Sequence, residues 1–301
     1  MLHPDRACAT SRRHPLSALH ASRAQPAALA AGLAGPDSPA AFLRAPASAS
    51  AARGPRRSVA VPEAAAQLYL QIVEESDYAE RLAPVIGGDF RDVLDVGAGN
   101  GALTRRCLGR PARWLAVEPG TAQGEALARL RPGLAGQGID FAHLAMSWQR
   151  LPAAIAAETV FSFNLDAAQD EARALFDNLA GRCRREMIWV VPAQAASSLA
   201  LTGLLPPELQ GGDRTPPVER TLAALAREQQ PNGVDFVDWT CRLRFNSREL
   251  VARQLLERLD VGEDSGHGRA IIDYLDYRLG PQGEEVSIVS TRRSAVLYWT
   301  F

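Results

Sequence analysis

The sequence contains no lysine, so all 33 of its basic residues are arginine, against 34 acidic residues. The formal net charge of −1 is unevenly spread. Residues 1–60 hold eight Arg and two Asp, which leaves about −7 on the rest of the chain. A negatively charged body is a poor ligand for a polyanion, so we expect no nucleic-acid partner.

Cysteine is also scarce, and the four cysteines are scattered without a Cys-x-x-Cys pair. This excludes the usual spacing of a zinc site or a disulfide framework, so we expect no metal and a reduced, cytoplasmic protein. Long apolar runs are missing too. The longest uncharged stretch, Met187–Pro207, is interrupted by proline and polar residues, so we expect no membrane partner.

Aromatic residues are nearly absent from residues 1–60, where Phe42 stands alone among Ala, Pro, Ser and Arg. Such a segment cannot bury enough apolar surface to order itself, and we predict a disordered leader. The pattern changes at Val61, where a helix over 61–82 is predicted. The predicted domain therefore spans residues 61–301.

Short apolar segments alternate with amphipathic ones through most of this domain. Near-continuously apolar strands separated by helices are typical of parallel strands covered on both faces. The fold class predicted is α/β, a doubly wound, mostly parallel, seven-stranded Rossmann-like sheet with helices on both faces. The alternation stops over residues 192–233, which we interpret as an insertion that caps the substrate site.

The stretch VLDVGAGNGALT (93–104) is a strand that ends near Asp95 and turns through Gly97, Gly99 and Gly101. Glycines let a backbone adopt positive φ and approach a ligand closely. Glu118 closes the next predicted strand, 21 residues after Gly97, the spacing expected of an acid that binds ribose hydroxyls. The pattern predicts a nucleotide-type cofactor.

Asp95 helps to choose between two cofactors. The letters GAGNGA also satisfy the dinucleotide fingerprint G-x-G-x-x-A, which leaves a nicotinamide cofactor open. A carboxylate two residues before the first glycine would repel a pyrophosphate but attract a ligand that carries an ammonium and a sulfonium. S-adenosylmethionine (SAM) carries both.

On these residues, and on WLAVEP as the strand that ends in the ribose acid, the chain resembles the class I SAM-dependent methyltransferases. The resemblance implies that Asp95 lies near the amino-acid end of SAM, that 97–101 passes along its methionine portion, and that Glu118 holds its ribose. Two features depart from the family. AMSWQRLP offers polar groups where an adenine-binding acid is common, and FSFNLD is not the Asn-Pro-Pro-aromatic signature of many nucleic-acid and protein nitrogen methylators. The predicted cofactor residues are Asp95, Gly97, Ala98, Gly99, Asn100, Gly101, Glu118, Pro119, Ser147, Trp148 and Asn164.

The function predicted is methyl transfer from SAM to a small-molecule acceptor by in-line displacement. No catalytic residue can be named, because orientation alone carries much of such a reaction. Two alternatives stay open: an NAD(P)-dependent oxidoreductase, favoured by GAGNGA, and a non-catalytic SAM-binding or scaffold protein of the same fold.

Overall fold

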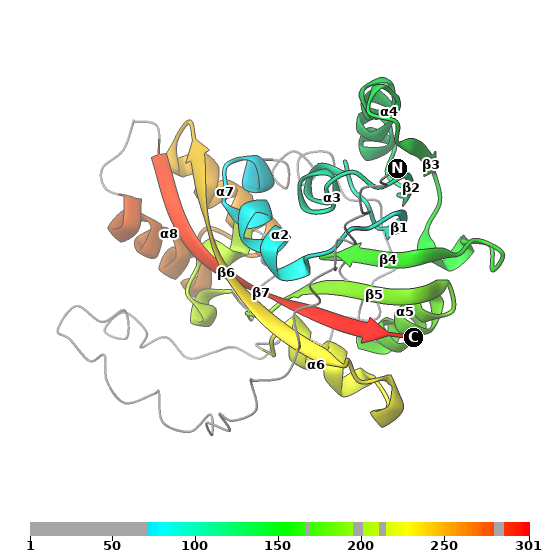
Figure 1. The fold of residues 1–301 in the computed structure, drawn as a ribbon. Coiled ribbons are helices and arrows are strands. Elements are labelled where there is room, and N and C mark those ends of the chain that lie inside the picture. Colours follow the sequence, from blue (N-terminus) through cyan, green and yellow to red (C-terminus); the bar gives the residue numbers. More distant parts are fainter. Residues whose placement is uncertain (1–70, 166–168, 195–200, 211–214, 280–285) are drawn as a thin grey trace, which may run out of the picture. The chain divides into compact units, whose positions relative to one another are not determined.

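A computed structural model describes residues 71–165, 169–194, 201–210, 215–279 and 286–301 (Figure 1). The leader predicted for residues 1–60 lies outside the described residues, as does the first half of the helix predicted over 61–82. None of the helices in the described part has the length and hydrophobicity needed to cross a membrane.

Seven strands form one sheet in the order β3-β2-β1-β4-β5-β7-β6. The first five in this order are parallel, and β7 is antiparallel to both β5 and β6. The predicted fold class is confirmed. The strands are β1 (Asp92–Val96), β2 (Arg113–Val117), β3 (Asp140–Leu144), β4 (Ala157–Phe163), β5 (Cys183–Pro192), β6 (Gly233–Phe245) and β7 (Val286–Thr300).

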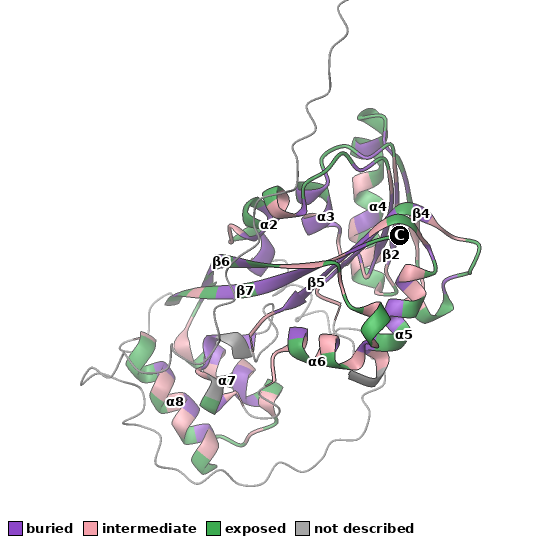
Figure 2. Cartoon of the chain, turned by 60° about the horizontal axis from the view of Figure 1, so that its bottom comes forward, coloured by how far each residue is buried: buried purple, intermediate pink, exposed green. Residues whose placement is uncertain are grey.

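Helices cover both faces of the sheet because successive strand residues point to opposite sides. In β1, for example, Val93 packs into one buried cluster and Leu94 into the other. Figure 2 shows the buried strands between helices whose outer faces are exposed. Residues from α2 (Tyr78–Ile86), α3 (Ala102–Cys107), α4 (Thr121–Gly136), α7 (Arg248–Leu259) and α8 (Gly266–Leu279) join the first cluster, and residues from α5 (Gln169–Ala180) and α6 (Pro217–Ala224) join the second.

The prediction of one continuous helix up to residue 82 is wrong. The helical residues before Glu75 end there, and a second helix, α2, begins at Tyr78. Ser76 forms an antiparallel bridge with Cys241, and the Asp77 amide donates to the Thr240 carbonyl at 3.1 Å. Backbone groups of Ser76 and Asp77 thus pair with the edge strand β6 instead of with a continuous helix.

Helix α7 is capped by Ser247, whose side chain accepts from the Leu250 amide at 3.2 Å. Asn246 and Glu249 have capping-box spacing, but the hydroxyl of Ser247 is the group that reaches the free amide, so the helix begins one residue later than that spacing implies.

The segment between β5 and β6 contributes to the core on both faces. Leu201 and Leu204 of the short helix η3 (Leu201–Leu204) join the first cluster, and Val218 and Leu225, in and next to α6, join the second. The described part of residues 192–233 is therefore packed into the domain, and a capping role over a substrate stays a prediction.

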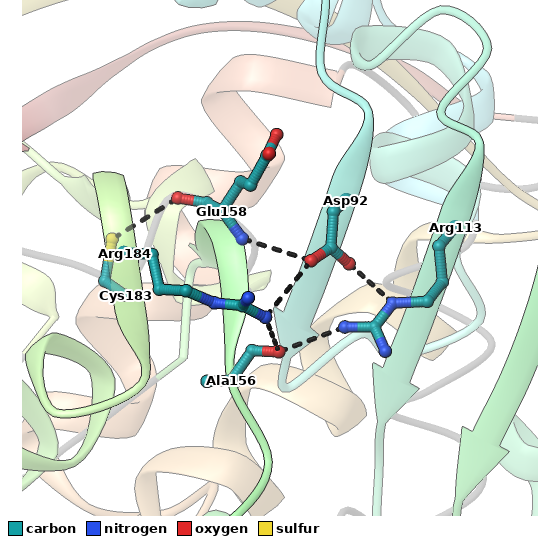
Figure 3. A network of polar contacts seen from close by, with 6 residues as sticks. All are labelled: Asp92, Arg113, Ala156, Glu158, Cys183 and Arg184. Carbon is teal, nitrogen blue, oxygen red and sulfur yellow. Dashed lines mark hydrogen bonds and ion pairs between the residues drawn. The ribbon is translucent and has the colours of Figure 1, made fainter.

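A polar network holds the beginnings of the strands together (Figure 3). Asp92, the first residue of β1, accepts from Arg113 Nε at 2.5 Å and lies 3.5 Å from Arg184. The carbonyl of Ala156 accepts from both arginines at 3.0 Å. The glycine turn follows the last residue of β1, so this network lies at the opposite ends of the strands. It therefore stabilises the fold and is not part of the candidate site.

Candidate functional site

The glycine turn connects β1 to α3 and is fastened to the neighbouring strand. Gly97, Gly99 and Gly101 have φ of 74°, 56° and 74°, a region that side chains disfavour. The Gly97 and Ala98 amides both donate to the Val117 carbonyl at the end of β2, at 2.9 and 3.2 Å. The turn therefore lies beside the residue that follows β2.

Two of these glycines also have close neighbours. A Cβ on Gly97 would lie 3.0 Å from Leu165 Cδ1, so the chain just after β4 packs against the start of the turn. A Cβ on Gly101 would lie 2.9 Å from the Trp114 ring and 3.0 Å from Leu127. Gly101 is thus required by the packing of α3 on the sheet, a reason that the motif alone did not reveal.

Glu118 and Gly99, which are 19 residues apart in sequence, meet in the structure. Glu118 Oε2 accepts from the Gly99 amide at 3.0 Å, and Oε1 accepts from the Gly120 amide at 2.9 Å. The side chain is half-buried. Each carboxylate oxygen has two acceptor positions, so capacity remains on both for hydroxyl groups of a ligand.

His143 supports Glu118 from the adjacent strand β3. Its Nε2 lies 3.0 Å from the Glu118 carbonyl oxygen, and the Glu118 amide donates to the Leu144 carbonyl at 3.1 Å. These contacts hold the backbone of Glu118 where β2 ends, and the bonds from the Gly99 and Gly120 amides orient its carboxylate.

Asp95 lies beneath the turn and has no exposed surface. Its Oδ2 accepts from the Thr104 hydroxyl at 2.5 Å, while its Oδ1 has no hydrogen-bond partner among the described residues. Burial raises the pKa of Asp95 to about 7, and the charge of Glu118 acts in the same direction, whereas the side chains of Thr104 and Trp114 oppose it by hydrogen bonding. A cation brought close to Oδ1 would satisfy a buried acceptor that is otherwise unpaired.

Three further predicted residues lie in or beside the turn. Asn100 Oδ1 accepts from the Ala102 amide at 3.1 Å and so serves the beginning of α3. Ala98 is buried, and Pro119 is exposed next to Glu118. A ligand bound beside Glu118 would therefore contact the backbone at these positions rather than the three side chains.

Ser147 and Trp148 stand at the short helix η2 (Trp148–Arg150) after β3. The Trp148 ring is partly buried against the second cluster, and its carbonyl accepts from Asn178 Nδ2 of α5 at 3.1 Å. The described contacts of Trp148 thus join it to α5, and an adenine contact by this ring stays a prediction.

Asn164 follows the last residue of β4 and takes a positive φ of 52°. Its Nδ2 lies 3.0 Å from the hydroxyl of Tyr78, a residue without exposed surface that comes from α2. The Tyr78 hydroxyl lies 2.9 Å from Ser294 Oγ of β7, which also accepts from Trp239 Nε1 at 3.1 Å. The Tyr78 and Trp239 rings stack at 4.1 Å. Four elements therefore meet at the end of β4.

The sequence prediction missed Thr104, Leu165, Tyr78 and Ser294 as contributors to this region. Thr104 could have been suspected, because α3 begins at Ala102 and its first turn must lie over the end of β1. No local pattern marks Tyr78 or Ser294, since both reach Asn164 only through the order of the strands. Within the described residues, no group of three or more His, Cys, Asp or Glu is placed to hold a metal ion.

No family model and no curated protein matches this sequence. Solved structures do match. Magnesium protoporphyrin IX methyltransferase from Synechocystis PCC 6803, with bound SAM, is 20% identical to this chain with a TM-score of 0.32. The match covers 41% of this chain and 59% of the methyltransferase, which is less than two thirds of the methyltransferase's length. A putative methyltransferase from Bacillus halodurans C-125 is 10% identical with a TM-score of 0.42 over 74% and 97% of the two chains. Geranyl diphosphate C-methyltransferase from Streptomyces coelicolor A3(2) is 13% identical with a TM-score of 0.41 over 74% of each.

Proposed function

We propose that this chain is a SAM-dependent methyltransferase that acts on a small-molecule acceptor. The observation that carries the proposal is the bond of 3.0 Å between the Glu118 carboxylate and the Gly99 amide. It brings an acid with spare acceptor capacity onto a turn whose backbone has positive φ. A carboxylate in this position suits the two hydroxyls of a ribose.

The charge beneath the turn favours SAM as the nucleoside. Asp95 Oδ1 is buried and unpaired among the described residues, and it stands under the backbone along which the methionine portion would run. An ammonium or sulfonium near this oxygen would be stabilised at low dielectric, whereas a pyrophosphate would be repelled. Because the side chain has no exposed surface, the contact requires either a bridging water or a small shift of the turn.

When bound, SAM supplies a methyl group on a positively charged sulfur, which is an activated leaving group. The residues of the chain then have to hold donor and acceptor in line and exclude water, and such orientation is worth about 7 to 11 kcal/mol. Glu118 and the turn would hold the nucleoside. Asn164, at the end of β4, would border the acceptor together with the described parts of residues 192–233, and Tyr78, which has no exposed surface, would lie behind Asn164.

The sheet order speaks against the oxidoreductase alternative. Dinucleotide-binding sheets of the Rossmann type have six parallel strands in the order 3-2-1-4-5-6. Here the sixth position in that order is taken by β7, which runs antiparallel to β5. The buried carboxyl of Asp95 also speaks against a dinucleotide. The fingerprint GAGNGA is the feature that still favours a nicotinamide cofactor.

Calorimetric titration with SAM, S-adenosylhomocysteine and NAD⁺ tests the proposal. We expect micromolar binding of the first two, and a loss of at least about tenfold in Glu118→Ala, the equivalent of about 1.4 kcal/mol of ribose hydrogen bonding. Glu125→Ala is the matched control, because it removes the same charge from an exposed position on the neighbouring helix α4. Equal affinity of wild type and Glu118→Ala would reject this site.

Turnover requires a separate measurement. Incubation with methyl-labelled SAM and a bacterial metabolite extract, followed by mass spectrometry, should give a labelled product. Binding of SAM without any labelled product would instead favour the non-catalytic alternative.

A further inference from the structure

Strand β6 is the last strand of the sheet, so in the described structure one of its two edges has no neighbouring strand (Figure 1). The backbone groups of Thr240 show which residues of β6 face this outer edge. The Thr240 amide donates to Asp77 Oδ1 at 2.7 Å, and its carbonyl accepts from the Asp77 amide at 3.1 Å. Backbone bonding in an antiparallel pair alternates along the strand, so every second residue from Thr240 directs its N–H and C=O groups outward.

The outer edge of β6 is covered along only part of its length. From Thr240 onward it is occupied, since the Arg242 amide also donates outward, to the Glu75 carbonyl at 2.9 Å. Before Thr240, no described residue bonds to the outward backbone groups. The residues with these open N–H and C=O groups are Val234, Phe236 and Asp238. A row of unpaired backbone groups is a template for pairing with another strand.

Phe236 lies at the centre of this open edge, and its side chain is 58% exposed. On the adjacent strand β7 it faces Ala295, whose methyl group is too small to cover the ring. Asp238, two residues on, is held by Arg293 at 2.6 and 2.7 Å. The exposed aromatic side chain favours association with a further strand, while the charged side chains on the same edge restrict which strand can pair there.

A second copy of the chain fits this edge with a two-fold axis at Phe236. Two strands related by such an axis run antiparallel. Phe236 then exchanges both backbone hydrogen bonds with Phe236 of the second copy, and Val234 does so with Asp238 of the second copy. Asp235 lies opposite Val237. An axis at Asp235 or Asp238 would instead place two aspartates directly opposite each other, which is destabilising.

An axis at either valine of this edge requires backbone groups that are already bonded. An axis at Val237 pairs Val234 with Thr240, whose amide and carbonyl are both occupied. An axis at Val234 pairs Phe236 with Asn232, whose amide already donates to a carbonyl of β7 at 2.8 Å. The axis at Phe236 therefore gives a partner to each open backbone group without opposing like charges.

We propose that residues 233–239 pair with the same segment of a second copy, antiparallel about a two-fold axis at Phe236. The sheet then continues from one copy into the other, and the two Phe236 side chains lie opposite each other. Directly opposite residues have Cβ atoms about 4.5 to 5.5 Å apart, close enough for an aromatic pair. The paired segment is short, so the dimer belongs to the small, reversible interfaces and dissociates in the micromolar range. The inference does not depend on the proposed function.

The first experiment measures the oligomeric state of the full-length wild-type chain. Sedimentation equilibrium is recorded from low micromolar to several hundred micromolar protein. The expected result is a reversible equilibrium between monomer and dimer, because a short strand pair gives a weak contact. A monomer over the whole range overturns the inference.

The second experiment places a charge on the axis. Phe236→Glu removes the aromatic pair and puts two carboxylates opposite each other, so we expect dimerisation to weaken at least about tenfold. Phe301→Glu is the matched control, because it makes the same change at another exposed phenylalanine, 54% exposed, outside residues 233–239. This control should keep the wild-type dimer. Equal dimerisation constants for the two variants overturn the inference.

A mixture of two variants tests the position of the axis. Phe236→Glu and Phe236→Arg should each be weak dimers alone, because each opposes like charges across the axis. Mixed in equal amounts, they should form a heterodimer at least about tenfold more stable than either homodimer, since a carboxylate then faces a guanidinium. The absence of any gain on mixing overturns an axis at Phe236. Circular dichroism checks that every variant is folded, as expected for changes at an exposed side chain.

Discussion

Thr104 Oγ1 lies 2.5 Å from Asp95 Oδ2, and this hydrogen bond is made where neither residue has more than 2% of its surface exposed. It links the first turn of α3 to the end of β1 directly under the glycine turn. Short O–H···O⁻ bonds of this kind are roughly twice as strong as neutral ones.

The first prediction concerns the loss of this bond. Thr104→Val keeps the shape of the side chain but removes the donor to Asp95 Oδ2. We expect a loss of about 1 to 3 kcal/mol in the free energy of unfolding, measured in urea. The loss should be larger at pH 8 than at pH 5, because leaving a charged carboxylate without this donor costs more free energy than leaving a neutral carboxyl without it. An equal loss at both pH values would show that the Asp95 carboxyl does not change its charge between them.

The second prediction follows from the pKa of Asp95. Burial raises it from the usual value of 3.8 to about 7, so the folded protein binds this proton more tightly than the unfolded chain. The contribution of Asp95 to stability is therefore most favourable below pH 4 and is lost as pH rises toward 7. In Asp95→Asn the melting temperature should decrease less between pH 5 and pH 8 than in the wild type. Thermal unfolding in both proteins across this range tests the sign.

The third prediction links this proton to the cofactor. If SAM places a positive charge near Asp95, binding lowers the pKa of that carboxyl, and the protein releases a proton at pH 6. The affinity for SAM should then increase from pH 6 to pH 8. Calorimetry in buffers with different ionisation enthalpies counts the released protons. Asp95→Asn should show neither the release nor the pH dependence, and a release that persists in this variant would assign it to another group.

The fourth prediction separates packing from backbone strain at the glycines. Gly101 and Gly109 both have positive φ, 74° and 63°, but a Cβ on Gly109 meets no atom within 4 Å. Gly109→Ala should lose about 1 kcal/mol of stability, from strain alone. Gly101→Ala should lose about 1 to 3 kcal/mol more, because Trp114 and Leu127 must move. Similar losses of stability for the two variants in urea unfolding would show that Trp114 and Leu127 move at little cost in free energy.

Much of the fold was predictable from local pattern. The sequence predicted a seven-stranded, mostly parallel sheet, because short apolar runs separated by amphipathic segments are typical of strands covered on both faces. The junctions were less predictable. The break at Glu75–Asp77 and the cap at Ser247 depend on which neighbouring group offers the better hydrogen bond, and this neighbour comes from β6 in the first case.

The candidate site divides in the same way. Spacing along the chain predicted an acid at Glu118 that binds a ribose, and this stays a prediction; the structure adds a bond from the Gly99 amide to the Glu118 carboxylate, which arises because the ends of adjacent parallel strands lie side by side. Spacing could not predict that the Asp95 side chain is fully buried, because its burial depends on which residues cover the turn.

The sequence by itself determined the strand pattern, the glycine turn and the acid that follows the second strand, since these arise from neighbours within about twenty-five residues. Only the tertiary structure decided that Tyr78, Asn164, Ser294 and Trp239 share one hydrogen-bond network. These residues come from helix α2, from strands β6 and β7 and from the position after β4, which are distant in sequence. Their side chains meet because β7 inserts antiparallel between β5 and β6, an order of strands that no local periodicity encodes.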